Sequence, residues 1–217
     1  MNGFLCDGPE AAGALVLLAH GAGGPMDSAL LTRLAGGLGG AGHRVVRFEF
    51  PYMAARRTGG GRRPPDRTDV LLQCWREVAA RWRDHRPLFL GGHSMGGRMA
   101  TMVADELGAA GLVCVSYPWH PPGAPGRPRT EHLKALATPA LLVCGTRDEF
   151  GTPEEVAGYA LSPALRVHWL PGADHSLRAH ARSGRTATGN IRECVDALDA
   201  FIRARAGLTA PAASPAG

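Results

Sequence analysis

Short apolar runs alternate with longer amphipathic stretches along almost the whole chain, and this alternation limits the possible folds more than any other feature. The amphipathic stretches have the apolar spacing of helices, and the apolar runs have the length of buried strands. Such alternation predicts an α/β fold, in which a mostly parallel sheet of about six strands is covered by helices on both faces. The predicted strands are residues 14–19, 43–50, 88–91, 112–117, 140–144 and 165–170, and the predicted helices are residues 27–38, 70–83, 95–107, 153–160 and 191–205.

Three segments depart from this pattern. Residues 53–68 are rich in Gly, Arg and Pro, and residues 121–139 are rich in Pro, so both are predicted to be loops, the second with a short helical stretch at 131–136. Residues 207–217 contain mainly Ala, Pro and Gly, which predicts a disordered tail. We therefore expect one domain over residues 1–206.

The net charge of +5 and the pI of about 9.3 raise the question of a nucleic-acid or membrane partner. Of the 24 basic residues, only Lys134 is lysine, and the chain also has 30 Gly and 17 Pro. This composition is typical of a GC-rich genome, so we expect no nucleic-acid partner. The longest apolar run, residues 14–19, is far shorter than the roughly 20 residues that cross a bilayer, and residues 1–5 do not resemble a signal peptide. We expect no membrane association.

The five cysteines are odd in number, and no two of them form a Cys-x-x-Cys pair. Cys114 and Cys144 lie within apolar runs, where a reduced cysteine packs as a small apolar side chain. This usage favours a reducing compartment, and we predict a cytoplasmic protein. Neither a metal site nor a cofactor is expected, because no cysteines or histidines have zinc-ligand spacing.

The strongest chemical signal follows the predicted strand at 88–91. Residues 91–97 read GGHSMGG, so Gly92-x-Ser94-x-Gly96 matches the G-x-S-x-G nucleophile elbow in its strand-to-helix context. A serine on such a turn is strained and needs neighbours without side chains. The following helix would direct its positive end toward the serine. Ser94 is the candidate nucleophile, and the alternative is a tight turn with an idle serine.

A serine hydroxyl needs a base, and His175 is the best-placed of the nine histidines. It follows the last predicted strand and precedes the last helix. We interpret His93 as structural because its side chain should point away from the hydroxyl, and His20 as a residue that orders the loop after the first strand. Most of the other histidines are expected at the surface: His43, His85, His120, His132, His168 and His180.

The third member should be a carboxylate that orients the imidazole. Asp148 follows the strand at 140–144 and is the first choice, with Glu149 as the alternative. Asp174 is too close to His175 along the chain and is interpreted as a loop residue. The order Ser94, Asp148, His175 is that of the G-x-S-x-G hydrolases.

An oxyanion intermediate needs two preorganised N–H donors. One should be the backbone N–H of Met95, directly after the serine. The other should come from residues 20–24 (HGAGG), and we choose Ala22, with Gly23 as the alternative. A phosphate-binding loop is excluded because no Gly-Lys-Ser/Thr follows.

With these loops, the chain resembles the alpha/beta hydrolases from about Ala14 to Arg205. Residues 48–53 (FEFPYM) and 61–66 (GRRPPD) are similar to a small group that includes the testis-expressed hydrolase-like proteins and a subunit of the nonspecific-lethal acetyltransferase complex. The chain also resembles dienelactone hydrolases, which have cysteine where this chain has Ser94. The resemblance implies the fold and a catalytic triad, but a substrate only weakly.

Two departures from larger members bear on the substrate. Only about thirteen residues precede the first strand, so the first hairpin is reduced or missing, and about twenty residues follow the strand at 112–117, too few for a helical lid. We expect no lid domain and an exposed site for small substrates. Arginines crowd residues 53–68, and we take Arg62, Arg63 and Tyr52 as candidate substrate-binding residues. The alternatives are a solvated loop and contact with an acidic partner.

The sequence thus predicts a serine hydrolase that cleaves carboxylic esters or thioesters through an acyl-enzyme on Ser94. Two alternatives remain open: an acyltransferase that uses the same residues, and a non-enzymatic protein-interaction module with a hydrolase fold. The expected ligand is a small-molecule ester or thioester.

Overall fold

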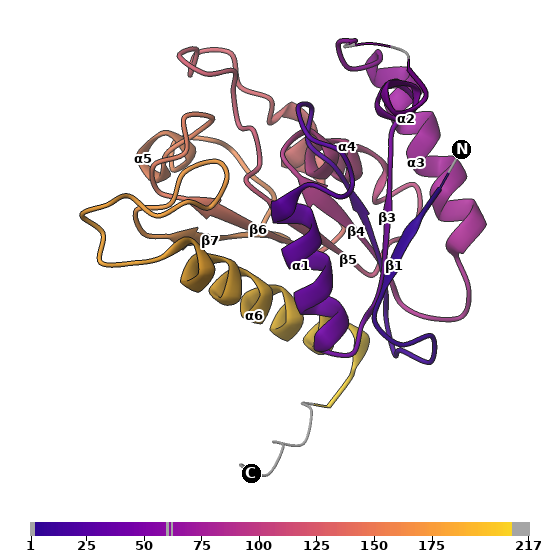
Figure 1. The fold of residues 1–217 in the computed structure, drawn as a ribbon. Coiled ribbons are helices and arrows are strands. Elements are labelled where there is room, and N and C mark those ends of the chain that lie inside the picture. Colours follow the sequence, from indigo (N-terminus) through magenta and orange to yellow (C-terminus); the bar gives the residue numbers. More distant parts are fainter. Residues whose placement is uncertain (1–2, 60, 62, 210–217) are drawn as a thin grey trace.

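The computed structural model describes residues 3–59, 61 and 63–209 (Figure 1). In this part of the chain one sheet has the strand order β1-β3-β2-β4-β5-β6-β7. Only β1 is antiparallel to its neighbour, so the sheet is mostly parallel, as predicted. The strands are β1 (Leu5–Asp7), β2 (Leu15–Ala19), β3 (Arg44–Phe48), β4 (Leu88–His93), β5 (Gly111–Val115), β6 (Ala140–Gly145) and β7 (Leu165–Leu170).

The seventh strand, β1, was not expected from the sequence. It has three residues and pairs only with β3, and its side chains are exposed or half-buried. A strand this short at a sheet edge has no apolar run to reveal it. The ion pair between Asp7 and Arg47, with 3.0 Å between Oδ2 and Nη2, helps to hold β1 at this edge. Because β1 does not pair with β2, the next strand along the chain, these two strands form no hairpin.

Helices cover both faces of the sheet (Figure 1). α1 and α6 pack side by side on one face, and α3 and α4 pack together on the other. The helices are α1 (Ala29–Gly40), α2 (Pro51–Arg57), α3 (Thr68–Trp82), α4 (Met95–Val103), the 3₁₀ helix η1 (Glu131–Ala135), α5 (Pro153–Val156) and α6 (Ala187–Ala206). The prediction of helices on both faces is therefore correct.

Helix α2 corrects the prediction of a loop from residue 53 onward. Pro51 occupies the first helical turn, where its missing N–H costs nothing, and the next residues are good helix formers. Arg56 and Arg57 lie in the last turn, where positive charge is favourable. The residues of α2 favour a helix, but the Gly and Pro residues that follow led to the whole segment being predicted as a loop.

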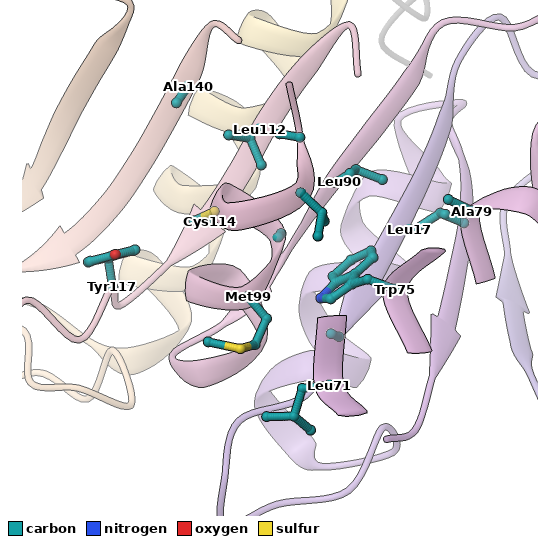
Figure 2. Packing of buried hydrophobic residues seen from close by; sticks show 14 of the residues in the cluster. Leu17, Leu71, Trp75, Ala79, Leu90, Met99, Leu112, Cys114, Tyr117 and Ala140 are labelled. Carbon is teal, nitrogen blue, oxygen red and sulfur yellow. The ribbon is translucent and has the colours of Figure 1, made fainter. Parts of the chain in front are cut away.

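The strands are buried on both sides and serve two apolar cores. Leu15 and Leu17 of β2 face α3 and α4, while Val16 and Leu18 face α1 and α6. Figure 2 shows the first core, in which Trp75 of α3 packs with residues from the sheet and from α4. Cys114 and Cys144 are buried in β5 and β6, as their apolar surroundings predicted. This double burial fixes the positions of the strand ends.

The chain order places a crevice between the ends of β2 and β4. From β2 the chain moves outward to β3 and then returns to β4 on the other side of β2. Ligands in α/β sheets bind beyond the carboxyl ends of the strands at such a reversal. The connection between β5 and β6 holds only loop and η1, so no lid domain stands over these strand ends.

The C-terminal part differs from the prediction of a tail that begins at residue 207. Gly207 adopts a left-handed conformation that ends α6, and the N–H of Leu208 donates to the Arg203 carbonyl at 3.0 Å. Leu208 packs against the core beside α6. Residues 207–209 are thus part of the domain, and the rest of the predicted tail, 210–217, lies outside the described residues. Among those described, no helix is both long and apolar enough to span a bilayer.

Candidate active site

Ser94 lies on a sharp turn between β4 and α4. Its φ of 52° is in the left-handed region, which is strained for a residue with a side chain. The flanking glycines are required by space: a Cβ on Gly92 would lie 2.1 Å from the Ala19 carbonyl oxygen, and one on Gly96 would lie 2.6 Å from the same atom. The end of β2 therefore forces the small neighbours that the sequence motif contains.

A hydrogen-bonded chain joins three side chains from separate loops. His175 Nε2 lies 2.9 Å from Ser94 Oγ, and His175 Nδ1 lies 2.9 and 2.8 Å from the two carboxylate oxygens of Asp148. A neutral ring with its proton on Nδ1 satisfies both contacts, because Nε2 can then accept the serine proton. Asp148 is 1% exposed and also accepts the N–H of Phe150 at 2.9 Å, whereas Glu149 is exposed.

Two further contacts hold His175 in place, one on its ring and one on its backbone. Phe150 stacks against it, with 4.1 Å between ring centroids and 30° between planes. His93 Nε2 lies 3.0 Å from the backbone carbonyl oxygen of His175 and donates to it. Burial lowers the pKa of His93 to about 4, so this ring is neutral near pH 7. The structural role of His93 is therefore a contact with the loop between β7 and α6 that carries His175. We call this segment, residues 171–186, the base loop.

The loop after β2 is held by buried side chains. His20 Nδ1 donates to the Gly21 carbonyl at 2.7 Å, and its Nε2 accepts the N–H of Phe50 at 3.1 Å. Burial lowers the pKa of His20, which keeps the ring neutral for this double role. The loop-ordering role predicted for His20 agrees with these contacts.

Tyr52 reaches the same loop from α2. Its hydroxyl donates to the Ala22 carbonyl at 2.9 Å, and the side chain is 2% exposed. Ala22 and Met95 both have backbone N–H groups that find no acceptor in the described part of the chain. These are the two donors expected of an oxyanion hole. Tyr52 thus supports the loop after β2, and its predicted contact with the substrate stays a prediction.

A pocket of about 560 Å³ opens at Ser94 between the loop after β2, the start of α1, the base loop and the start of α6. Its apolar walls are formed by Leu30, Phe150 and Ile191. It is also lined by His93 and His175. Arg33 and Arg178 also line it. Neither arginine was predicted from the sequence to lie at the site. Arg178 follows shortly after His175 in the sequence, so its place near the site could have been predicted. Arg33 offered no such signal.

Arginines of the segment 53–68 contact neighbouring groups of the protein. Arg57 pairs with Glu49 and Asp27, with Nη2–O distances of 2.8 and 2.6 Å, and Arg56 lies over the Tyr52 ring. Arg63 lines another hollow of about 550 Å³, which is also lined by Ala22 and Gly23 of the loop after β2, and its carbonyl accepts from Arg56. Arg62 lies outside the described residues. Neither Arg57 nor Arg63 reaches the pocket at Ser94.

The expectation that the remaining histidines lie mostly at the surface is wrong. Only His85 and His180 are exposed. The others are at least half-buried and bond to polar partners: His43 to Asp199, His120 to Glu155, His132 to Thr101 and His168 to Glu193. A polar partner on one ring nitrogen offsets part of the cost of burying each ring, and His120 has partners on both nitrogens. No group of three His, Cys, Asp or Glu side chains suited to a metal was found in residues 3–59, 61 and 63–209.

Comparison with known structures gives the same fold. Est1E from Butyrivibrio proteoclasticus has a TM-score of 0.70 at 16% identity, with 94% of each chain covered. The protein XC6422 from Xanthomonas campestris, an α/β serine hydrolase without a lid, has a TM-score of 0.64 at 22% identity, with 97% of this chain and 90% of that chain covered. A serine hydrolase homologue from Coxiella burnetii has a TM-score of 0.64 at 22% identity, with 92% and 90% covered. A sequence profile for the alpha/beta hydrolase domain matches residues 12–203, so the chain belongs to the alpha/beta hydrolase family.

Proposed function

We propose that this protein is a serine hydrolase that cleaves carboxylic esters or thioesters through an acyl-enzyme on Ser94. The observation that carries the proposal is the contact of 2.9 Å between Ser94 Oγ and His175 Nε2, with the opposite ring nitrogen held by buried Asp148. A serine is a poor nucleophile without a base in hydrogen-bond reach, and a base needs a third group to orient it.

In the acylation step, Ser94 Oγ attacks the acyl carbon while its proton passes to His175 Nε2. The carbonyl π electrons move onto oxygen, where the N–H groups of Met95 and Ala22 stabilise the charge. The intermediate then collapses, the bond to the leaving group breaks, and the alcohol or thiol takes the proton from His175. Asp148 stays ionised and stabilises the imidazolium that exists between these events.

In the deacylation step, a water molecule replaces the leaving group. His175 Nε2 takes a proton from this water as its oxygen attacks the acyl carbon, and then returns the proton to Ser94 Oγ as the acyl–oxygen bond breaks. The products are the carboxylic acid and the free enzyme. The absence of a lid favours small substrates.

The similar structures support this reaction class. They include an esterase domain from Rhodothermus marinus and two lipolytic enzymes, and Est1E is also known with ferulic acid bound, at 17% identity and a TM-score of 0.71. Within the family, residues 48–53 and 61–66 support the narrower likeness to the testis-expressed hydrolase-like proteins.

The test is labelling with a fluorophosphonate probe together with hydrolysis of 4-nitrophenyl esters. We expect the wild-type protein to be labelled at Ser94, and Ser94→Ala to lose labelling and hydrolysis while its circular dichroism and melting temperature stay the same. The matched control is Ser176→Ala, because Ser176 lines the same pocket without touching His175 Nε2. A folded wild-type protein that remains unlabelled and hydrolyses no ester would contradict the proposal and favour a protein-interaction module.

A further inference from the structure

The pocket at Ser94 carries positive charge that no carboxylate balances. Arg33 enters from α1 and Arg178 from the base loop, and none of the described residues that line the pocket is Asp or Glu. Asp148 lies behind His175 and is 1% exposed. Two guanidinium groups in a hollow without an acid create a positive potential that attracts an anion.

Arg33 is held at the rim by α6. Its Nη2 donates to Thr188 Oγ1 at 2.9 Å, which joins the first helix to the start of the last one. The structure gives Arg33 no ion pair with any described residue, so its charge and its other N–H groups remain available. Arg33 and Ile191 also line a second hollow of about 320 Å³ between α1 and α6.

Arg178 is fixed through its backbone. Its N–H donates to Asp174 Oδ1 at 2.9 Å, and its carbonyl accepts the N–H of Asp174 at 3.0 Å. Asp174 Oδ1 also accepts the N–H of Ser176, so this oxygen is engaged with the backbone of the base loop. The Arg178 side chain makes no hydrogen bond or ion pair with the described residues. The base loop thus presents a free guanidinium group a few residues from His175.

We propose that this pocket selects esters or thioesters that carry a negatively charged group, such as a carboxylate, remote from the scissile bond. Arg33 and Arg178 bind the charge, and Leu30 and Ile191 contact the carbon chain between the charge and the reacting carbonyl. The volume of about 560 Å³ suits a small molecule of this kind. The inference rests on the proposed function and names its substrate class. The predicted contacts of Arg62 and Arg63 with the substrate stay predictions.

The test compares substrates that differ only in the distal charge. Mono-4-nitrophenyl adipate carries a terminal carboxylate, and 4-nitrophenyl hexanoate has the same six-carbon acyl chain without it. We expect the wild-type kcat/KM to be higher for the adipate ester, and Arg33→Gln and Arg178→Gln each to lower the adipate-to-hexanoate ratio by about tenfold, the range of a hydrogen bond to a charged group. Added salt should lower the ratio in the wild-type protein.

A second pair of substrates locates the charge. 4-Hexanoyloxybenzoate carries its carboxylate on the leaving group, and 4-acetylphenyl hexanoate is the neutral counterpart. A preference for either charged ester that both arginine variants remove supports the inference and assigns the charge to the acyl side or to the leaving group. Arg166→Gln is the control, since Arg166 is exposed on β7 and lines none of the hollows described above. No preference in the wild-type protein, or an equal loss in Arg166→Gln, overturns the inference.

Binding measurements separate this inference from the proposed function. If hexanoate is hydrolysed at Ser94 without any charge preference, the inference fails and the proposed function stands. If no ester is hydrolysed, isothermal titration with adipate still decides: binding that the double variant Arg33→Gln/Arg178→Gln loses supports the anion site without catalysis, and an absence of binding overturns it.

Discussion

At the scale of single residues, several buried side chains act on the backbone of the site. His93 holds the carbonyl of His175, His20 joins the loop after β2 to Phe50, and Tyr52 holds the carbonyl of Ala22. Burial raises the pKa of Tyr52 to about 12, so its hydroxyl remains a donor at any ordinary pH. Such contacts orient the peptide groups that would face an oxyanion, and preorganised N–H groups are worth most in the transition state.

Tyr52→Phe tests this positioning role. Loss of the bond to Ala22 O should loosen the loop and lower kcat for 4-nitrophenyl esters by roughly tenfold, with KM nearly unchanged, because only the transition state uses the N–H fully. Steady-state kinetics measure the effect. Tyr159→Phe is the matched control, since its hydroxyl lies 3.5 Å from the Pro125 carbonyl, away from the pocket. A raised KM at constant kcat would instead show that Tyr52 contacts the substrate.

At the scale of elements, α2 is tied to the loop that follows β2. Glu49, at 1% exposed, accepts two bonds from Arg57 Nε at 2.9 and 2.8 Å and one from the backbone N–H of Met26 at 3.2 Å. Arg57 also pairs with Asp27, just before α1. The hydrogen bonds to Glu49 and Asp27 raise the pKa of Arg57 above its usual range. One guanidinium group therefore connects α2, the end of β3 and the approach to α1.

Arg57→Ala should destabilise this connection. Glu49 would keep a buried carboxylate with only the Met26 N–H as partner. We expect a loss of about 2 kcal/mol in the free energy of unfolding, below the roughly 3–5 kcal/mol of a fully buried pair because Arg57 is itself 41% exposed. Urea denaturation measures it. Arg67→Ala is the control: its pair with Asp69 is exposed on both sides, and its removal should cost less than about 0.5 kcal/mol. Equal losses of unfolding free energy in the two variants would show that the ion pairs of Arg57 contribute no more than an exposed surface pair.

The parallel sheet, the elbow at Ser94 and the loop of His175 could be predicted from the sequence, because each produces a local pattern with a steric or chemical cause. The sequence favoured Asp148 and kept Glu149 as the alternative, since both follow the same strand. The Phe150 N–H and the turn of that loop direct Asp148 toward the ring. The pairing of Arg33 with Arg178 in one pocket was also hidden, because it depends on how α1 and the base loop meet across the sheet.

At the scale of the whole molecule, the domain buries neutral histidines between its layers. Burial lowers the pKa of His93 to about 4, and burial together with the charge of Arg98 lowers that of His132 to about 4. Burial also lowers the pKa of His20 and His43. All four rings take up protons more readily in the unfolded chain, where a histidine titrates near 6.5. Stability should therefore rise with pH in this range, because the unfolded state binds more protons.

The free energy of unfolding should be constant above about pH 7 and fall as the pH drops from about 6.5 toward 4. Each histidine contributes a slope of at most about 1.4 kcal/mol per pH unit. His132→Gln keeps a neutral partner for Thr101 Oγ1, which lies 2.9 Å from His132 Nε2, but removes the titrating group, so its curve should be flatter. Urea denaturation at pH 7.5, 5.5 and 4.5 compares the two proteins, with His85→Gln as the exposed control that keeps the wild-type slope. If the pH slope of the unfolding free energy is unchanged in His132→Gln, His132 takes up a proton in the native state as readily as in the unfolded chain. The layer between α4 and η1 would then tolerate a charge beside Arg98.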